Sequence, residues 1–584
     1  MSIAAGNDGE TGAERMLNAL DEEQAVAAKA LIGPVCVLAG AGTGKTRAIT
    51  HRIAYGVATG VYSPNRVMAL TFTARAAAEL RSRLRPLGAG GVAARTFHAA
   101  ALSQLNYFWP QVVGGDLPRL LEGKARMLGQ AAETLKLRID TGTLRDLAAE
   151  IEWRKVSSLS LADYEVVART SRPLPGRLTL EQVLNMHQQY EDIKDERRQL
   201  DFEDVLLSIA GMIEQEPSVA LQIREQYRFF VVDEYQDVSP LQHHLLTLWL
   251  GGRRDLCVVG DASQTIYSFA GAKAEYLLGF ASEYDDATVV RLEQNYRSST
   301  EVVELANRLM NGRPGALSLT AAGEVPVHGD VPTVTPHETD LAEARAVAAK
   351  IGLLMAAGAP AGEIAVLYRV NAQAAVLETA LADAGISYQI RGSKRFFDLP
   401  EVKQAVMSLR AASVSITGEP LFKSVSDVLR SLGWRQGAPE SRGAARDKWE
   451  SLNALMGLAE QQAAGTTFRA FTDELMDRAS SGHEPTIQAV TLATLHSAKG
   501  LEWTAVFIIG LSEGLVPISY ASSFEQIDEE RRLLYVGITR ARRLLELSYS
   551  QSGSGRNSAR APSRFLAEAA PGRRTPGGLE TATR

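Results

Sequence analysis

An eight-residue pattern near the start of the chain constrains the fold more than any other feature. Residues 39–46 read Ala-Gly-Ala-Gly-Thr-Gly-Lys-Thr, with alanine at the first small position, where glycine is usual. The pattern follows the short apolar run 34–38 and precedes a helical pattern that begins at Lys45. Successive backbone N–H groups of such a glycine-rich turn can point at one anion. The sequence therefore predicts a phosphate-binding loop between a buried strand and a helix.

The individual loop residues indicate how a nucleotide would be held. Lys45 would place its charge at the β- and γ-phosphate oxygens, and the Thr46 hydroxyl would ligate Mg²⁺. We therefore expect ATP and Mg²⁺ as cofactors. The other loop residues expected to contact the nucleotide are Ala39, Gly40, Ala41, Gly42, Thr43 and Gly44.

An acidic pair follows a second apolar run. Phe229-Phe230-Val231-Val232 predicts a buried strand, and Asp233-Glu234 comes directly after it. Asp233 could hold Mg²⁺ through its water shell, and Glu234 could polarise the attacking water. The alternative is a solvated acidic loop, which the preceding apolar strand disfavours.

Strand and helix patterns alternate along two parts of the chain. Each alternation predicts a parallel α/β sheet. The expected strands are 34–38, 67–72, 229–232 and 256–259 in the first part, and 364–367, 489–492 and 506–509 in the second. Residues 99–200, which we expect to be broken at Pro110, Pro173 and Pro175, are helical in period. A second helical stretch covers 398–487.

These patterns predict two α/β cores, each with one helical insertion. The first core would comprise residues 1–98 and 201–290 around the insertion 99–200. The second would comprise 291–397 and 488–569 around the insertion 398–487, with surface loops or edge strands over 311–337. Residues 570–584, rich in Pro, Gly, Thr and Arg, are expected to form a disordered tail.

Composition excludes several classes of protein. The chain has 62 Lys and Arg against 68 Asp and Glu, a net charge of −6, which excludes a polybasic nucleic-acid coat protein but not a local basic groove. Cys36 and Cys257 are the two cysteines, so neither a disulfide framework nor a cysteine-based zinc site is expected. No stretch approaches about 18 consecutive apolar residues. We expect an intracellular, cytoplasmic protein with no membrane partner.

Further motifs, in order from Leu17 to Leu566, resemble the UvrD/Rep/PcrA family of superfamily 1 DNA helicases. The two motifs nearest the C-terminus, Thr494 to Glu502 and Glu529 to Ala541, are long and unusual in composition, which makes coincidence negligible. The motifs are Leu17-Asn18 with Gln24, Leu70-Thr71-Phe72-Thr73, Thr96-Phe97-His98, Asp233-Glu234-Tyr235-Gln236-Asp237, Val259 to Tyr267, Asn295-Tyr296-Arg297-Ser298, Thr494 to Glu502 and Glu529 to Ala541.

The resemblance implies two RecA-like parallel-sheet motor cores, each with a mainly helical inserted subdomain. It also implies roles at the nucleotide. Gln24 would read the adenine, and Tyr296 and Arg47 would stack on its two faces, because a planar guanidinium stacks as well as pairs. Arg297 and Arg540 would reach the γ-phosphate from the second core, where charge spreads over the phosphoryl oxygens. Gln264 would sense that phosphate, and Glu502 would bind the ribose hydroxyl.

The family pattern also implies a track for single-stranded DNA, held by base stacking and by cations along the backbone. For Phe72 the alternative is a core aromatic, and for His98 and His496 it is a structural histidine. Arg540 lies in the predicted helical run Glu529–Arg543, where an arginine is otherwise a solvated side chain. The expected DNA contacts are Phe72, Thr96, His98, Tyr267, Phe269, Arg369, Asn371, His496 and Lys499.

The chain departs from the family pattern in several places. Phe269 stands where the family often has Trp, and Ala270 where it has Arg; Ala374 and Ala375 stand where Ser-Arg is usual. The second insertion is shorter than in relatives, which leaves the regulation of unwinding open. We expect residues 570–584 to be too short for the C-terminal extension of some relatives.

We expect an ATP-dependent 3′→5′ translocase and helicase of DNA repair or replication, with ATP hydrolysis stimulated by single-stranded DNA. Its partners would be single-stranded DNA and single/double-strand junctions, with unidentified repair or loading proteins. The alternative is a translocase that strips bound proteins from DNA and separates strands little. Polarity and the preference for DNA over RNA come from the resemblance alone.

Overall fold

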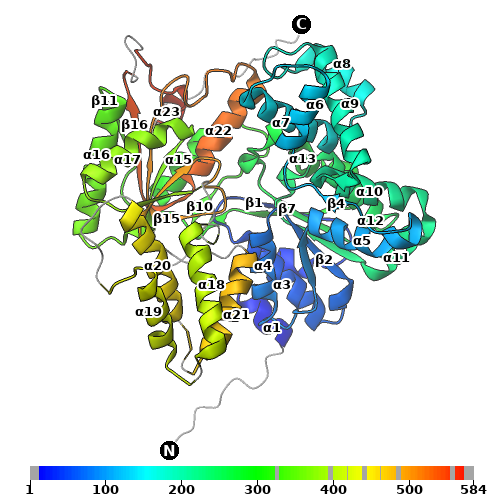
Figure 1. Cartoon of the computed structure of the whole chain (residues 1–584), viewed down its shortest axis with the longest axis horizontal. Coiled ribbons are helices and arrows are strands. Elements are labelled where there is room, and N and C mark those ends of the chain that lie inside the picture. The colour runs from blue at the N-terminus through cyan, green and yellow to red at the C-terminus, as the bar shows by residue number, and fades with distance from the viewer. Residues whose placement is uncertain are drawn as a thin grey trace, which may run out of the picture. The chain divides into compact units, whose positions relative to one another are not determined.

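The computed structural model describes residues 12–322, 328–391, 397, 399–416, 418–436, 444–460, 462–463, 465–481, 488–552 and 559–570. The chain divides into two compact units (Figure 1). The first unit ends at Leu292, and the second begins at Glu293 and includes the loop residues Ala41–Thr43. The expected tail from 571 onward lies outside the described residues.

The first unit is built on a six-stranded parallel sheet. The strand order is β3-β2-β6-β7-β1-β8. The strands are β1 (Val35–Ala39), β2 (Val67–Thr71), β3 (Ala93–Thr96), β6 (Phe229–Val232), β7 (Leu256–Gly260) and β8 (Thr288–Leu292). Because all run the same way, the carboxyl ends of β1, β6 and β7 meet at one edge, where ligands bind in open α/β sheets.

Helices cover both faces of this sheet. Side chains alternate along each strand, so Phe230 and Val232 enter one apolar core while Phe229 and Val231 enter the other. Burial on both faces explains why these strands read as continuous apolar runs. The covering helices are α2 (Glu22–Lys29), α3 (Lys45–Ala58), α4 (Ala74–Leu84), α5 (Phe97–Val112), α10 (Phe202–Gln215), α11 (Pro217–Gln226) and α12 (Pro240–Leu250).

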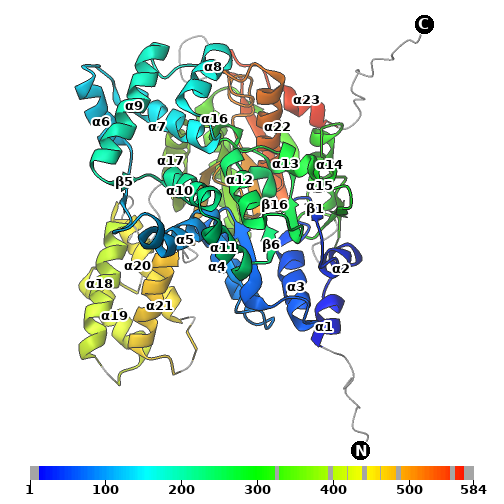
Figure 2. The same ribbon diagram turned by 90° about the vertical axis from the view of Figure 1, so that its right-hand side faces the viewer.

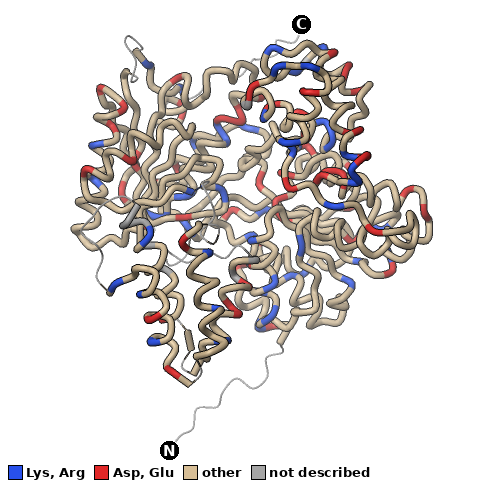
Figure 3. The backbone as a smooth tube through the Cα atoms, in the orientation of Figure 1, with Lys and Arg blue, Asp and Glu red and all other residues tan. Residues whose placement is uncertain are grey.

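A separate helical body is inserted into the first unit (Figure 2). It contains α6 (Ala125–Thr134), α7 (Thr141–Val156), α8 (Leu161–Ser171) and α9 (Leu180–Glu196), with its own apolar core. A pair of two-residue strands, β4 (Arg119–Leu120) and β5 (Gln199–Leu200), joins its two ends. Lys and Arg positions are interspersed with Asp and Glu over these helices (Figure 3).

The expected break at Pro110 is wrong. Helix α5 runs through Pro110 to Val112, and its first residues pack in the core beside the sheet rather than in the inserted body. Proline removes one backbone donor and crowds the preceding turn. Here it removes only the bond from its own nitrogen to the preceding turn, and residues beyond it still donate to Trp109 O before the helix ends.

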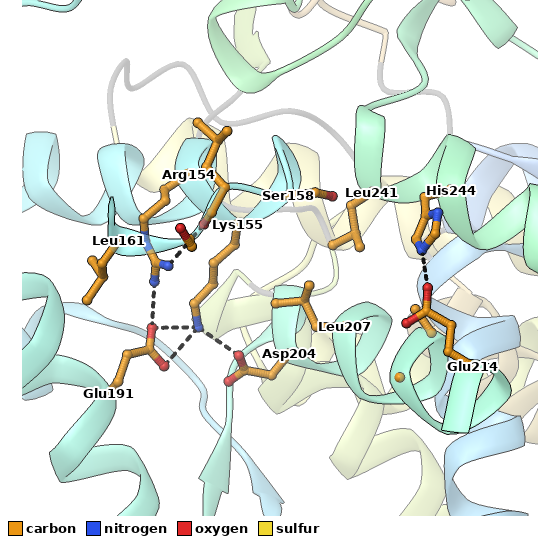
Figure 4. Close-up of a pocket in the computed structure, with 14 residues that line it drawn as sticks. Arg154, Lys155, Ser158, Leu161, Glu191, Asp204, Leu207, Glu214, Leu241 and His244 are labelled. Carbon is orange, nitrogen blue, oxygen red and sulfur yellow. Dashed lines mark hydrogen bonds and ion pairs between the residues drawn. The ribbon is translucent and has the colours of Figure 1, made fainter. Parts of the chain in front are cut away.

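A buried charge cluster joins the inserted body to the start of α10 (Figure 4). Lys155 Nζ lies 2.8 Å from Asp201 Oδ2, 2.7 Å from Asp204 Oδ1 and 2.9 Å from Glu191 Oε1. Lys194 Nζ approaches Asp201 Oδ2 at 3.3 Å. Although burial raises it, the two ammonium groups hold the pKa of Asp201 well below its usual value. Asp201 also caps α10, so the cluster sets where that helix begins.

Replacing Lys155 with methionine should lower the free energy of unfolding by about 3 kcal/mol, because it leaves buried carboxylates with one cation fewer. Lys194 remains and keeps the loss at the low end of the usual range. Urea unfolding followed by tryptophan fluorescence measures the change. The matched control is Arg169→Met, which breaks the exposed pair of Arg169 with Glu165 on α8 and should cost about 0.5 kcal/mol or less. Equal losses in the two variants would contradict the role given to Lys155.

The second unit is built on another six-stranded parallel sheet. The order is β11-β16-β15-β12-β14-β13. The strands are β11 (Thr333–His337), β12 (Ile364–Tyr368), β13 (Tyr388–Arg391), β14 (Val490–Thr494), β15 (Trp503–Ile508) and β16 (Ala541–Ser550). The segment 311–337, expected as loops or edge strands, contributes the edge strand β11 and the short β10 (Thr320–Ala321), which pairs with β9 (Gln294–Asn295).

Four helices form a second inserted body with its own core around Leu409, Leu429 and Phe471. They are α18 (Pro400–Ser415), α19 (Leu421–Ser431), α20 (Ala444–Glu460) and α21 (Phe468–Ser481). The helices that accompany the sheet include α15 (Thr300–Met310), α16 (Asp340–Ala356), α17 (Ala374–Asp383), α22 (Phe524–Ile538) and α23 (Arg564–Ala569). The predicted fold class, two parallel α/β cores with helical insertions, is confirmed.

The expected helical run Glu529–Arg543 is wrong at its end. Helix α22 stops at Ile538, and Arg543 lies in strand β16. The Thr539 side chain donates to Tyr535 O at 2.9 Å beyond the last turn, and the sequence from Leu545 alternates apolar and polar residues, which suits a strand. No helix among the described residues is both long and apolar enough to cross a bilayer.

Candidate active site

The phosphate-binding loop lies between β1 and α3, as the sequence pattern predicts. Gly42 and Gly44 adopt left-handed conformations, with φ of 73° and 77°. A side chain at either position would be strained, because L residues rarely adopt such angles. The loop ends at Lys45 and Thr46, the first residues of α3. The exposed N–H groups and positive dipole end of this helix favour an anion there.

Gln24 packs against this loop from the first turn of α2. Its side chain is 3% exposed, and a Cβ added to Gly44 would lie 2.7 Å from Gln24 Nε2. Arg47 is exposed, and its guanidinium donates to the carbonyl of Ala19. Tyr296 belongs to the second unit, where its hydroxyl donates to Gln294 Oε1 at 3.1 Å. The expected stacking of Arg47 and Tyr296 on one adenine therefore stays a prediction.

Two acidic residues follow strand β6 and face the loop lysine. Lys45 Nζ lies 3.6 Å from Glu234 Oε1 and makes no hydrogen bond within the described part of the chain. Burial and the Glu234 charge raise the pKa of Asp233 to about 7, although Lys45 lowers it. Glu234 has φ of 54°, a left-handed conformation that costs a non-glycine residue on the order of 1 kcal/mol or more. Such strain is typical of functional sites.

This donor set fits Mg²⁺. Asp233, Glu234 and Asp261 lie within electrostatic reach of a single ammonium, that of Lys45, so negative charge is in excess. Mg²⁺ usually binds through one or two protein oxygens together with phosphates and water. No cluster of three or more His, Cys, Asp or Glu side chains suited to a metal occurs among the described residues. That Thr46 and Asp233 would hold the ion beside a triphosphate stays a prediction.

Two buried amides connect the acidic pair with the segment after β7, and we call Glu234, Gln236, Asp261 and Gln264 the amide–carboxylate chain. The Gln236 side chain donates to Glu234 Oε2, and its Oε1 accepts from the Asp261 N–H at 3.0 Å. Gln264 Nε2 donates to Asp261 Oδ2 at 2.8 Å. Sequence reasoning assigned no role to Gln236 or Asp261. Asp261 stands directly after buried strand β7 and Gln236 four residues after β6, both inside recognised motifs, which is the signal that could have found them.

Two aromatic residues come shortly after Gln264, the last member of the amide–carboxylate chain, in the sequence. The Tyr267 and Phe269 rings lie 6.1 Å apart, edge to face, and Phe269 is 63% exposed. Burial raises the pKa of Tyr267 to about 12, and the Asp237 charge adds to the rise. Phe72, at the end of β2, is 38% exposed, so the interpretation of Phe72 as a core aromatic is wrong. Exposed aromatic rings can stack on unpaired bases.

The residues after β3 place a histidine beside another exposed ring. His98 contacts Phe202 edge to face, with the ring centroids 5.9 Å apart, and burial and the Lys124 charge lower the pKa of His98. Thr96 caps α5, and its hydroxyl accepts from the Ala99 N–H at 3.1 Å. Phe202 is 54% exposed and was missed; an aromatic directly after the helix cap Asp201 could have indicated it.

Three predicted nucleotide residues lie together in the second unit. Arg297 Nε pairs with Glu502 Oε2 at 2.5 Å, and Arg542 pairs with the other oxygen of Glu502. Although burial raises it, these two cations lower the pKa of Glu502. Arg540 is 2% exposed and donates to Val536 O at 2.9 Å and Leu501 O at 3.1 Å. The Arg540 guanidinium is thus fixed in direction by backbone carbonyls.

The predicted DNA contacts of the second unit gather beyond strands β12 and β14. Arg369 forms a two-point ion pair with Glu530, with Nη2–Oε1 of 2.8 Å and Nε–Oε2 of 3.0 Å. Burial and the charges of Arg369 and Lys499 lower the pKa of His496 to about 4, so this ring is neutral at pH 7. Asn371 is exposed. The Arg369 guanidinium would therefore contact a phosphate while it stays paired with the Glu530 carboxylate.

Comparisons with known proteins follow the same division. The UvrD/REP helicase N-terminal domain matches residues 20–285, and the UvrD-like helicase C-terminal domain matches 290–415 and 419–552. The chain is 47% identical over 579 residues to the ATP-dependent DNA helicase UvrD2 of Mycobacterium tuberculosis (strain ATCC 25618 / H37Rv), which covers 95% of this chain and 82% of the relative. It is 29% identical to DNA helicase II of Escherichia coli (strain K12), covering 95% and 88%. It is 27% identical to the ATP-dependent DNA helicase PcrA of Bacillus subtilis (strain 168), covering 95% and 86%.

Proposed function

The chain belongs to the UvrD/REP helicase family, and on that basis we propose that it is an ATP-dependent DNA helicase that moves 3′→5′ along single-stranded DNA. Single-stranded DNA would stimulate its ATP hydrolysis, in repair or replication. The observation that carries the proposal is the amide–carboxylate chain, which runs from the Lys45 and Glu234 site to the segment of Tyr267 and Phe269. Direction of travel and the preference for DNA over RNA rest on the sequence resemblance, and the proposed cytoplasmic location rests on the composition.

In the proposed mechanism the predicted nucleotide-site residues act on the triphosphate, on its Mg²⁺ or on the attacking water. Lys45 binds the β- and γ-phosphate oxygens, and Thr46 and Asp233 hold Mg²⁺, which neutralises developing charge when bound. Glu234 accepts a proton from the attacking water. Arg297 and Arg540 would stabilise the charge that spreads over the transferred phosphoryl group. The role of the two arginines requires that the two units close around the nucleotide, which is a prediction from the family pattern.

Strand binding is proposed to combine stacking with cations. Phe72, Tyr267 and Phe269 would stack on bases, and Thr96, His98, Asn371, His496 and Lys499 would lie near the sugar-phosphate backbone. Arg369 would join them while paired with Glu530. Alternating grip between the units would convert hydrolysis into movement.

One assay tests the core of this proposal. The intact protein is given ATP and Mg²⁺ with an oligo(dT), with the matching oligo(U), or with no polymer, and phosphate release is measured. We expect turnover to rise with oligo(dT) and to rise less with oligo(U). An unstimulated rate with oligo(dT) would reject the proposed function, and equal stimulation by both polymers would reject the preference for DNA.

Salt dependence gives a separate prediction. If Arg369 and Lys499, the two charged contacts proposed above, bind the strand, affinity for oligo(dT) should fall by about sevenfold between 50 and 200 mM salt, because each contact releases counterions from the strand. Fluorescence anisotropy with a labelled oligo(dT) measures the affinity at each salt concentration. A flat response would contradict cation contacts with the strand.

A second candidate function is a translocase that strips proteins from DNA and separates strands little. Ala270 and Ala375 are exposed. The family pattern has arginine at both places, so polar contacts with a strand would be missing there. Unwinding of a forked duplex is measured beside displacement of streptavidin from a biotinylated single strand. Robust unwinding by the isolated chain would dismiss this alternative, and displacement without unwinding would favour it.

A further inference from the structure

Gln236 occupies a position that the nucleotide chemistry does not explain. It stands two residues after Glu234 in the short helical turn η2 (Tyr235–Asp237) and is fully buried. Its amide nitrogen donates to the Glu234 carboxylate, and its amide oxygen accepts from the Asp261 N–H at 3.0 Å. One side chain therefore joins the ends of two neighbouring strands, β6 and β7.

At its other end, the amide–carboxylate chain leads to the segment that carries Tyr267 and Phe269. The Asp261 carboxylate accepts from the Ser263 N–H at 2.9 Å and from Gln264 Nε2 at 2.8 Å, so the turn η3 (Ala262–Gln264) is fastened to it. Tyr267 follows three residues later, and the exposed ring of Phe269 two residues after that. A displacement of the Tyr267 and Phe269 segment would move Asp261. Because the Asp261 N–H donates to Gln236 Oε1, the Gln236 side chain would then move as well.

We propose that Gln236 is a positioning residue, which orients the Glu234 carboxylate and transmits to it the occupancy of the strand site at Tyr267 and Phe269. This inference rests on the proposed function and adds the element that would link strand binding to the rate of hydrolysis. The left-handed backbone of Glu234 supports it, because a side chain on a strained backbone needs a partner that fixes its direction.

The chemistry of the position requires an amide. Glutamine donates and accepts at once, whereas glutamate would set a second carboxylate against Glu234 and methionine would make neither bond. On the Asp261 side the hydrogen bond is buried, so solvent does not replace the lost partner there. Gly260 protects the arrangement: a Cβ there would lie 2.5 Å from Gln236 Oε1 and 2.8 Å from Leu277 Cδ2.

The test compares Gln236→Met, Gln236→Glu and Gly260→Ala with wild type. The kcat and KM for ATP are measured with and without oligo(dT), together with affinity for oligo(dT). We expect the oligo(dT)-stimulated kcat of Gln236→Met to fall about ten- to a hundredfold, as expected for losing a hydrogen bond to a charged group. The KM for ATP and the oligo(dT) affinity should stay within about twofold. Gln236→Glu should be at least as impaired.

Gln242→Met is the matched control. Gln242 is also buried and lies on the same segment, but its side chain caps α12 by accepting from the Ser239 N–H at 3.2 Å and takes no part in the chain to Glu234. It should keep the wild-type ratio of stimulated to unstimulated rates. Gly260→Ala displaces the Gln236 amide without changing either carboxylate, so it decides the question if the Gln236 variants do not fold.

Two results would overturn the proposal. The first is Gln236→Met matching Gln242→Met, and the second is an equal loss of stimulated and unstimulated rates, which would mean that Gln236 does not transmit the occupancy of the strand site. A wild-type protein that oligo(dT) does not stimulate would instead reject the proposed function, so the two failures are distinguishable.

Discussion

Lys45→Ala should lower kcat for ATP hydrolysis by about a hundred- to a thousandfold, with and without oligo(dT). The Lys45 ammonium lies 3.6 Å from Glu234 and makes no hydrogen bond within the described part of the chain, so it remains available to phosphate oxygens. The loop backbone does not depend on the lysine side chain. Phosphate release measures the rate, and circular dichroism with thermal melting checks that the fold is kept.

Lys29→Ala is the control for that experiment. Lys29 is exposed at the end of α2, so its removal should leave the rate within about twofold of wild type. If Lys45→Ala retains more than about a tenth of the wild-type rate, the assignment of residues 39–46 to the phosphates is wrong.

Glu234→Gln should lower kcat by about a hundred- to ten-thousandfold while ATP still binds. The amide has the same shape as the carboxylate but accepts no proton from water. Its neutral charge also removes one of the anions near Asp233 and Lys45, so affinity for the nucleotide should not fall. A fluorescent ATP analogue measures binding, and single-turnover hydrolysis measures the chemical step.

Glu225→Gln is the matched control, because Glu225 is exposed on α11 and lies outside the acidic pair. Hydrolysis at the wild-type rate by Glu234→Gln would assign the water-activating role to another group. Loss of ATP binding in the same variant would show that Glu234 serves binding rather than turnover.

Much of the fold followed from local sequence patterns. Buried strands of parallel sheets are continuous apolar runs, so β1, β2, β6, β7, β12 and β14 lie within a residue or two of the predicted runs. Strands β3, β8, β13 and β16 were not predicted; β3 is short with two polar residues, and β16 follows a helix without a proline or glycine between them. The predicted break at Pro110 was wrong because helix α5 tolerates a proline close to its C-terminal end.

The sequence by itself determined the phosphate-binding loop, the acidic pair after β6, the two α/β alternations and the family, because each depends on neighbouring residues. Only the tertiary structure decided which side chains meet. Arg369 pairs with Glu530 across 161 positions, and Gln236 reaches Asp261 across 25. Such partners depend on strand order, which periodicity does not encode: β6 lies beside β7 and β12 beside β14 because of how the sheets are wound. Contacts between distant segments are therefore determined by packing. Burial and the helical or strand period can be read from neighbouring residues in the sequence.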